Sequence, residues 1–514
     1  MQIRVTSGRL SEQQSDALVV ALFEGEDRLS NVGARVDEAL GGAMRQIIQQ
    51  GDITGKQDEL TLIHTLGKIG APRVLVVGLG KRNLFSLDTV RITSAEAARR
   101  LRGLRLRSIA FEPFGVETGL QTEAVGQAIA EGVVLGLYTF ARHKSSAESV
   151  RSLDSISIVA TDDSTAESLR QGVERGRILA GAANFARDMA NEPSNYMTPT
   201  ELASQAREAA DAAGLECQVL DREDMVELGM GALLGVAKGS HEEPKFIVLS
   251  YKGDPGTDRA IGFVGKGITF DTGGISIKPA DHMEEMKGDM SGGATVIAAL
   301  KAIAELGPHI NVTGIIPATE NMPGGGATKP GDVLVAMNGK TIEVINTDAE
   351  GRLILADGLS YARKLDLSPL IDVATLTGAI SIALGDVAVG VMSNNQELVD
   401  QLIEAGKQSG EKLWQLPMYR EYREQIDSDV ADIKNTAGNR KAGSIIAAWF
   451  LSEFVDQTPW AHLDMAGVDL YDRERGWIVK GASGIPVRTL INFAMDRAKA
   501  SSEERQPEAA IGGD

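Results

Sequence analysis

Residues 260–274 read AIGFVGKGITFDTGG, and this stretch decides how the second half of the chain folds. The run from Ala260 to Gly265 is short and apolar, which predicts a buried strand. The glycines after it permit a sharp turn and a close approach of the backbone. Lys266 and Asp271 come directly after the strand. In open α/β sheets ligands bind beyond the carboxyl ends of strands, so this segment is a candidate site.

A second charged segment follows another predicted strand, residues 341–345. Residues 346–353 read NTDAEGRL and contain Asp348, Glu350 and Arg352. Taken singly, each carboxylate could merely cap a helix or face solvent. We expect both charged segments to lie on the same rim of one sheet, and their convergence favours a functional site.

Strand-like and helix-like segments alternate along the chain. In the first third, residues 17–23 and 73–80 are predicted strands, and residues 94–103 and 124–141 are predicted helices. The second part continues the pattern, with a helix predicted at 291–306. This alternation is typical of βαβ units. We therefore predict an α/β fold with two domains, each a mostly parallel or mixed sheet flanked by helices.

One long helical segment sets the predicted domain boundaries. Residues 164–190 are rich in Ala, Arg and Leu, and they end at a turn cluster, NEPSN, at 191–195. We predict an N-terminal α/β domain over 1–163, a connector helix over 164–190 and a C-terminal domain with the candidate site over 191–500. Residues 501–514 are polar without an apolar period and are predicted to be disordered.

Composition limits the class of protein. The chain has 514 residues, with 71 acidic against 52 basic residues and a formal net charge of −19. Nucleic-acid binding requires a cationic surface, so this charge disfavours nucleic acid as the main partner. A single cysteine, Cys217, excludes an internal disulfide framework and a thiolate zinc cluster. We see neither a signal peptide nor an apolar run of about 20 residues, so we expect a cytoplasmic protein without membrane spans.

The two charged segments and the residues around them supply four carboxylates, those of Asp271, Asp289, Asp348 and Glu350. If these groups converge, mutual repulsion raises their pKa values unless cations balance them. Two divalent cations supply the matching charge, and a metal pair about 3.5 to 4 Å apart is a common hydrolytic arrangement. Lys278 and Arg352 would then leave the pocket cationic, which suits a developing oxyanion and a small anion beside it.

These segments resemble the signatures of the leucyl aminopeptidase (cytosol aminopeptidase) family. Residues 346–353 match the family signature without a substitution, and the spacing of four further residues also matches, namely Lys266, Asp271, Lys278 and Asp289. Weaker agreements lie at 191–193 with 198–199, at 375–378 and at 464–467. The resemblance covers about residues 190–497, whereas the N-terminal third agrees only in general character.

The resemblance implies two divalent metal ions per subunit. One would be held by Lys266, Asp271, Asp289 and Glu350, and the other by Asp271, Glu350 and Asp348. Lowering the pKa of a lysine from about 10.4 to neutrality costs roughly 4 to 5 kcal/mol, which two adjacent dications can supply. Without metal ions, Lys266 is expected to be charged and to pair with the carboxylates. Oxygen-rich ligands suit Mn²⁺ or Mg²⁺, and Zn²⁺ is also compatible.

The resemblance also implies catalytic and substrate-binding residues. Lys278 and Arg352 would be the catalytic pair, with Lys278 as electrophile and Arg352 holding a bicarbonate ion as general base. A water bridging the metal ions would attack the first peptide carbonyl. Met286, Thr375 and Gly378 match positions that line the side-chain pocket, which would favour Leu, Met and similar residues. The family resemblance further implies a homohexamer that acts on short peptides during intracellular protein turnover.

Three other functions can be considered from the residues alone. Residues 74–80 resemble the start of a dinucleotide-binding turn, but Asn83 stands where a third glycine is needed. A serine hydrolase would need a nucleophile elbow, and residues 289–292, DMSG, do not match it. A DNA-binding role, as some relatives of the family have, is disfavoured by the acidic charge.

Overall fold

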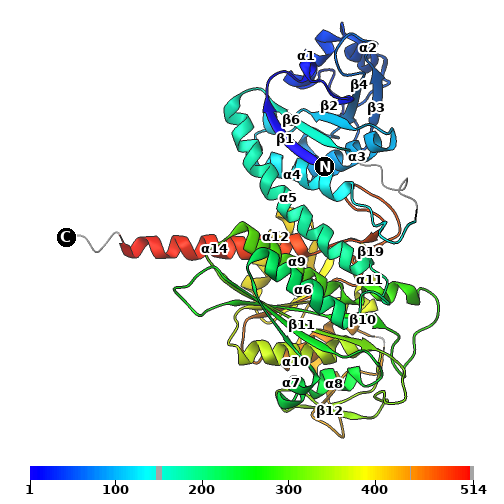
Figure 1. Ribbon diagram of the computed structural model, residues 1–514, viewed down its shortest axis with the longest axis vertical. Coiled ribbons are helices and arrows are strands. Elements are labelled where there is room, and N and C mark those ends of the chain that lie inside the picture. Colours follow the sequence, from blue (N-terminus) through cyan, green and yellow to red (C-terminus); the bar gives the residue numbers. More distant parts are fainter. Residues whose placement is uncertain (146–152, 440, 510–514) are drawn as a thin grey trace. The chain divides into compact units, whose positions relative to one another are not determined.

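The computed structural model describes residues 1–145, 153–439 and 441–509, of which 501–509 are described by their backbone alone (Figure 1). The chain divides into two compact units. Unit 1 consists of Met1–Gly181 with Arg473–Val479, and unit 2 consists of Ala182–Asp472 with the C-terminal residues from Lys480. The division falls within α5 (Asp163–Asn191), a helix of 29 residues.

Unit 1 is built on a six-stranded sheet in the order β1-β6-β5-β2-β4-β3, in which β3 is antiparallel to β4 and the other pairs are parallel. Its strands are β1 (Gln2–Ser7), β2 (Ala17–Leu22), β3 (Leu60–His64), β4 (Arg73–Gly78), β5 (Ser108–Phe111) and β6 (Ser155–Ala160). Strand β2 is buried at every position, because helices cover both faces of the sheet. Such strands are apolar throughout rather than alternating.

The helices of unit 1 divide between the two faces of this sheet. They are α1 (Asn31–Ala39), α2 (Ala43–Gln50), α3 (Leu87–Gly103), α4 (Thr122–Gly136) and the first part of α5. One buried cluster joins β2 and β4 to α1 and α2, and the other joins the opposite face to α3, α4 and α5. The chain therefore leaves β2 toward one face and leaves its neighbour β5 toward the other.

Unit 2 is built on a nine-stranded mixed sheet in the order β16-β15-β18-β14-β9-β11-β8-β7, with β10 pairing β11 off this path. Its strands are β7 (Glu216–Leu220), β8 (Lys245–Lys252), β9 (Ile261–Gly265), β10 (Gly267–Asp271), β11 (Asn311–Asn321), β14 (Leu370–Ala374), β15 (Val389–Ser393), β16 (Leu413–Gln415) and β18 (Trp460–Asp464). The central strands β18, β14, β9 and β11 are mutually parallel, so their carboxyl ends meet at one edge.

Helices cover both faces of the nine-stranded sheet (Figure 1). On one face lie α6 (Pro199–Ala213), α9 (Ser291–Leu306), α12 (Gln396–Ser409) and α14 (Val487–Ala509). On the other lie α7 (Arg222–Glu227), α8 (Gly231–Ala237), α10 (Glu350–Lys364) and α13 (Gly443–Ser452). The short helix α11 (Gly378–Leu384) follows β14. The predicted α/β class with two domains is therefore confirmed.

The predicted placement of both charged segments on one sheet is wrong. The strand before the second segment, β13 (Thr341–Glu343), pairs with β12 (Val333–Val335) and β17 (Ile433–Lys434) in a separate three-stranded sheet. A strand of three residues carries too little pattern to specify its partners, because strand pairing is a long-range property. A further small sheet joins β19 (Leu470–Tyr471) to β20 (Gly481–Ala482).

The structure differs from the predicted domain bounds at two places. Residues 473–479, assigned from the sequence to the C-terminal domain, belong to unit 1, where the Arg99 guanidinium donates to the Gly476 carbonyl oxygen at 2.6 Å. Residues 501–509, predicted to be disordered, continue α14 to Ala509. Once a helix has formed, extending it by one residue costs far less than nucleating it, so polar residues can prolong it. Residues 510–514 lie outside the described residues.

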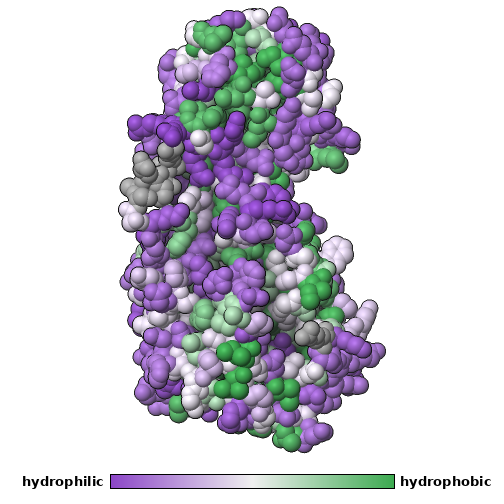
Figure 2. All heavy atoms as spheres, turned by 90° about the vertical axis from the view of Figure 1, so that its right-hand side faces the viewer, coloured by the Kyte–Doolittle hydropathy of each residue, from purple (hydrophilic) through white to green (hydrophobic). Residues whose placement is uncertain are grey.

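The face of the molecule shown in Figure 2 is mainly hydrophilic. On the face shown in Figure 2, hydrophobic residues gather in a band on unit 1 and in smaller groups on unit 2. Across the described ranges, every helix is too short or too polar to cross a bilayer.

A buried polar cluster links the central strands β14 and β18. Asp372 and His462 lie opposite each other in the parallel register, and one Asp372 oxygen lies 2.6 Å from His462 Nδ1. The other accepts a hydrogen bond of 2.6 Å from Trp460 Nε1. Burial alone would lower the pKa of His462, but the Asp372 carboxylate outweighs burial and raises it. Asp372 therefore supplies a hydrogen-bonding partner to two buried polar side chains.

We expect Asp372→Ala to lower the free energy of unfolding by about 3 to 5 kcal/mol, because it leaves the buried His462 imidazole and an indole N–H without their acceptor. Urea unfolding followed by tryptophan fluorescence measures the change. Asp211→Ala, at an exposed position of α6, is the matched control and should unfold as the wild type does. An unchanged midpoint for Asp372→Ala would contradict this account of the sheet.

Candidate metal centre and substrate pocket

Lys266 is held by its backbone between the central strands and a helix. It follows β9, where its N–H donates to the Val373 carbonyl oxygen at 3.0 Å and its own carbonyl oxygen accepts from Gly293 N–H at 2.7 Å. Gly293 lies in the first turn of α9. These bonds leave the Lys266 side chain 3% exposed, at the carboxyl end of the sheet.

Asp271 ends a strand that the sequence pattern did not reveal. Residues 267–271 form β10, which pairs with β11 so that Asp271 lies opposite Asn321. The turn after β10 contains Gly273 and Gly274 with φ of +87° and +64°, a left-handed conformation that favours glycine. Gly273 N–H donates to Asp271 Oδ1 at 2.8 Å, which orients the carboxylate.

The second charged segment reaches the same place from the start of α10. Glu350 is the first residue of that helix, and Asp348 lies in the turn before it. Gly351 is required here, because a Cβ at this position would lie 2.8 Å from Lys266 Nζ. The absence of a side chain at position 351 therefore leaves the space that Lys266 occupies.

The two segments meet through four ion pairs. Lys266 Nζ lies 2.8 Å from Asp289 and 2.9 Å from Glu350. Lys278 Nζ lies 2.9 Å from Asp271 and 2.6 Å from Asp348. Lys266 therefore contacts two of the carboxylates with which it was predicted to share a site.

The pKa values show how the charges act on one another. Burial alone would lower the pKa values of Lys266 and Lys278, but the surrounding carboxylates outweigh it and raise both. Burial raises the pKa of Asp271 to about 6, assisted by the nearby Glu350 carboxylate. Burial also raises the pKa of Asp348 and, strongly, that of Asp289. The pKa of Glu350 is lowered, because the two lysines outweigh its burial.

The cluster carries more negative than positive charge. Four carboxylates face two ammonium groups, and carboxylate oxygens of Asp271, Asp348 and Glu350 all lie within 4.8 Å of one another. Two unit charges about 4 Å apart interact by about 4 kcal/mol at an effective dielectric constant of about 20. Oxygen donors at this spacing fit divalent cations, which would supply the missing positive charge.

Asn321, at the end of β11, connects the two segments and was missed from the sequence. Its side-chain amide donates to Asp271 Oδ1 at 2.8 Å and to the Thr347 carbonyl oxygen at 3.0 Å. It also lies 3.4 Å from a Glu350 oxygen. The available signal was its position at the end of a central strand, β11.

A cavity of about 300 Å³ opens beside the cluster. It is lined by the five residues predicted to hold metal ions, by Lys278, and by the predicted pocket residues Met286, Thr375 and Gly378. Thr375 is also part of the cluster, because its hydroxyl donates to Asp289 Oδ1 at 2.7 Å and its carbonyl oxygen accepts from Lys266 Nζ at 3.0 Å. A Cβ at Gly378 would have no other group within 4 Å, so this position leaves the cavity wide.

Arg352 differs from the other predicted site residues in its position. It is buried in the first turn of α10, and its Nη1 donates to the Asn435 carbonyl oxygen at 2.7 Å. It is not among the described residues that line the cavity. Burial lowers its pKa to about 10, although the nearby Glu350 and Asp464 carboxylates oppose this, so the guanidinium stays charged at neutral pH.

Comparisons with protein families match both units. The profile of the cytosol aminopeptidase family, catalytic domain, matches residues 184–491. The profile of the cytosol aminopeptidase family, N-terminal domain, matches residues 19–147.

Curated relatives match almost the whole chain. A probable cytosol aminopeptidase from Alkaliphilus metalliredigens is 44% identical over 501 residues, which cover 97% of this chain and 100% of the relative. One from Solibacter usitatus is 47% identical over 497 residues, which cover 96% and 99% of the two chains.

Solved structures agree in fold. A mutant of tomato leucine aminopeptidase matches with a TM-score of 0.86 and 34% identity, covering 96% of this chain and 97% of the other. The bottromycin maturation enzyme BotP in complex with Mn matches with a TM-score of 0.83 and 33% identity, covering 94% of this chain and 100% of the other.

We expect Asn321→Ala to weaken the binding of Mn²⁺ by about 10- to 100-fold, because residues that orient metal ligands typically contribute this much to affinity. Calorimetric titration of metal-depleted protein measures the affinity. Asn338→Ala, in an exposed turn, is the control and should bind Mn²⁺ as the wild type does. Wild-type affinity in Asn321→Ala, with an unchanged thermal unfolding temperature, would show that the amide does not orient the ligands.

Proposed function

The chain belongs to the cytosol aminopeptidase family, a family of metal-dependent aminopeptidases, and from this premise we propose that it removes N-terminal Leu and other apolar residues from peptides. The observation that carries the proposal is the meeting of Asp271, Asp289, Asp348 and Glu350 around two lysines at the wall of a cavity. Intracellular peptide and protein turnover is the proposed role.

We assign five residues to two metal ions. One ion would be held by Lys266, Asp271, Asp289 and Glu350, and the other by Asp271, Asp348 and Glu350. When bound, two divalent cations supply an acidified water and polarise the scissile carbonyl. Lys266 Nζ would lose its proton and its ion pairs with Asp289 and Glu350 on becoming a ligand. The oxygen-rich donor set and the Mn-bound BotP structure support Mn²⁺, with Zn²⁺ as the alternative.

Lys278 is the proposed electrophile. Its side chain is 22% exposed and lines the cavity, and its ammonium group is held by two carboxylates. The raised pKa keeps it protonated at neutral pH. A fixed cation beside the scissile carbonyl stabilises the oxyanion as it develops and does not have to reorganise during the reaction.

Arg352 is the proposed holder of a bicarbonate ion that serves as general base. Its Nε is buried and makes no hydrogen bond to any described residue, whereas its Nη1 is engaged by Asn435. A buried guanidinium with an uncommitted N–H favours a small planar anion as its partner. Because Arg352 is not among the described residues that line the cavity, it would act through such an ion rather than by direct contact with the peptide.

The substrate pocket is proposed to accept one apolar side chain. Met286 supplies an unbranched, adaptable apolar surface, and Gly378 leaves open space beside it. Thr375 connects this pocket to the metal centre, because it contacts both Lys266 and Asp289. The free α-amine of the peptide would face the metal-binding carboxylates, which explains a requirement for an unblocked N-terminus.

We further propose that the chain acts in the cytoplasm as a homohexamer whose active sites face an internal cavity, so that short peptides are its substrates. The cytosol aminopeptidase names of its relatives support the location. The formal charge of −19 supports peptides rather than nucleic acid as partners.

Glu350→Ala is expected to lower kcat/KM for an N-terminal-leucine peptide by at least about 1,000-fold, because a ligand shared by both ions contributes several kcal/mol to the transition state. Metal content, measured by mass spectrometry, should fall with it. The exposed Glu404→Ala is the matched control. Chelation followed by readdition of Mn²⁺ or Zn²⁺ identifies the metal. Wild-type turnover in Glu350→Ala would overturn the metal assignment.

Mass photometry of the purified protein is expected to give a single species of six chains. Since restricted access is proposed to select short peptides, the hexamer should cleave short peptides and leave a folded protein with an N-terminal leucine intact. A stable monomer with full activity would contradict the proposed assembly.

A further inference from the structure

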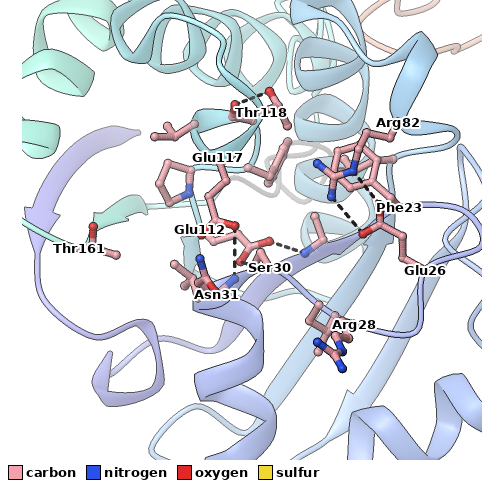
Figure 3. Close-up of a pocket in the computed structure, with 18 of the residues that line it drawn as sticks. Phe23, Glu26, Arg28, Ser30, Asn31, Arg82, Glu112, Glu117, Thr118 and Thr161 are labelled. Carbon is pink, nitrogen blue, oxygen red and sulfur yellow. Dashed lines mark hydrogen bonds and ion pairs between the residues drawn. The ribbon is translucent and has the colours of Figure 1, made fainter.

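Unit 1 contains a cavity between two neighbouring strands whose following helices lie on opposite faces of the sheet (Figure 3). It lies at the carboxyl ends of β2 and β5, which are adjacent and parallel. The chain leaves β2 toward α1 on one face and leaves β5 toward α4 on the other. In doubly wound sheets, such a switch point opens a crevice in which ligands bind.

The cavity is small and has apolar walls. Its volume is about 190 Å³. Pockets for drug-sized ligands measure roughly 300 to 1,000 Å³, so the ligand here is smaller than a nucleotide. The walls include Phe23, Leu29, Leu79 and Phe114. These side chains favour a compact apolar body.

One side of the cavity carries a buried carboxylate. Glu112 follows β5 and is 1% exposed. One of its oxygens accepts from Ala21 N–H at 2.6 Å, and the other accepts from the Ser30 hydroxyl at 2.5 Å, as Figure 3 shows. Within the described ranges, no lysine, arginine or histidine forms an ion pair with it. Burial raises the pKa of Glu112 to about 7, although the hydrogen bonds from Ser30 and Ala21 oppose this.

The other charged residues of the cavity do not neutralise Glu112. Arg82 is engaged by Glu26, with two bonds of 2.7 and 3.0 Å, and its guanidinium lies 4.0 Å from the centre of the Phe23 ring. Glu117 adds a second carboxylate, and Arg28 lines the cavity from an exposed position. A phosphate or carboxylate placed beside Glu112 and Glu117 would be repelled.

We propose that this cavity binds a small organic ammonium ion with an apolar body, with the ammonium group on Glu112 and the body against the apolar walls. A buried carboxylate without a cationic partner attracts a positive charge, and burying the apolar part against the apolar walls adds to the affinity. A free apolar amino acid has this chemistry, with Arg28 available for its carboxylate, and so does a simple alkylamine. The choice of a free amino acid as the ligand rests on the proposed function, because the proposed peptide hydrolysis releases free amino acids.

The binding test uses the full-length protein and isothermal titration calorimetry at pH 7 with three probes. These are L-leucine, 3-methylbutylamine, which lacks the carboxylate, and 4-methylpentanoate, which lacks the ammonium group. We expect saturable binding of the amine to one site per chain that Glu112→Gln weakens at least 10-fold. If L-leucine binds more tightly than 3-methylbutylamine, the ligand of this cavity is a free amino acid. If the amine binds more tightly, the ligand is a simple amine. 4-Methylpentanoate should not bind.

Three variants separate this site from the metal centre and from effects on folding. Glu123→Gln, at an exposed position of α4, should bind as the wild type does. Leu29→Trp should abolish binding although Glu112 is retained, because the larger side chain fills the cavity. Any binding at the metal centre should persist in Glu112→Gln and disappear in Glu350→Ala. Peptide hydrolysis by Glu112→Gln without added amine should equal that of the wild type, so failure of this proposal is distinguishable from failure of the peptidase assignment.

A proton measurement provides an independent readout. An ammonium ion beside Glu112 favours its ionised form, so binding at pH 7 should release about half a proton per amine. Titrations in two buffers of different ionisation enthalpy measure this release, and Glu112→Gln should abolish it. Equal affinity of the wild type, Glu112→Gln and Leu29→Trp for the amine, or binding of 4-methylpentanoate as tight as that of the amine, would overturn the proposal.

Discussion

The structure of unit 2 depends on balancing negative charge at one edge of a buried sheet. Carboxylates from two distant segments meet there, and two lysine ammonium groups bridge between them. Two ammonium groups offset only half of the charge, and burial, assisted by the nearby Glu350 carboxylate, raises the pKa of Asp271 to about 6. The positive charge that the lysines do not supply is what the proposed divalent cations would provide.

The neighbouring backbone provides space and hydrogen bonds for these charged side chains. Gly351 leaves room for the Lys266 side chain, and the left-handed turn at Gly273 aims a backbone N–H at Asp271. Asn321 then ties the first segment to the second through one amide group. Glycine turns and hydrogen bonds therefore fix the positions of the carboxylates. Such preorganisation increases affinity by reducing the entropy lost on binding.

The two units use one architectural rule for different chemistry. Each places polar groups beyond the carboxyl ends of parallel strands, where backbone groups and helix starts converge. In unit 2 several carboxylates share a cavity with two lysines, which suits metal ions and a peptide. In unit 1 a single buried carboxylate lies among apolar side chains, which suits a small organic cation. The number of carboxylates and the polarity of the walls account for the difference.

Local sequence determined the elements and the identity of most site residues. The helix predicted at 291–306 is α9 with the same bounds, because apolar periodicity and its terminal glycine are local properties. The charged side chains around 266–289 and 346–353 were likewise found from residue type and spacing. The tertiary structure alone decided that β13 joins a separate sheet, that Asn321 connects the two segments, and that Arg352 is not among the described residues that line the cavity. Each of these depends on contacts between residues far apart in the chain, and such contacts leave no periodic signal in the residues that make them.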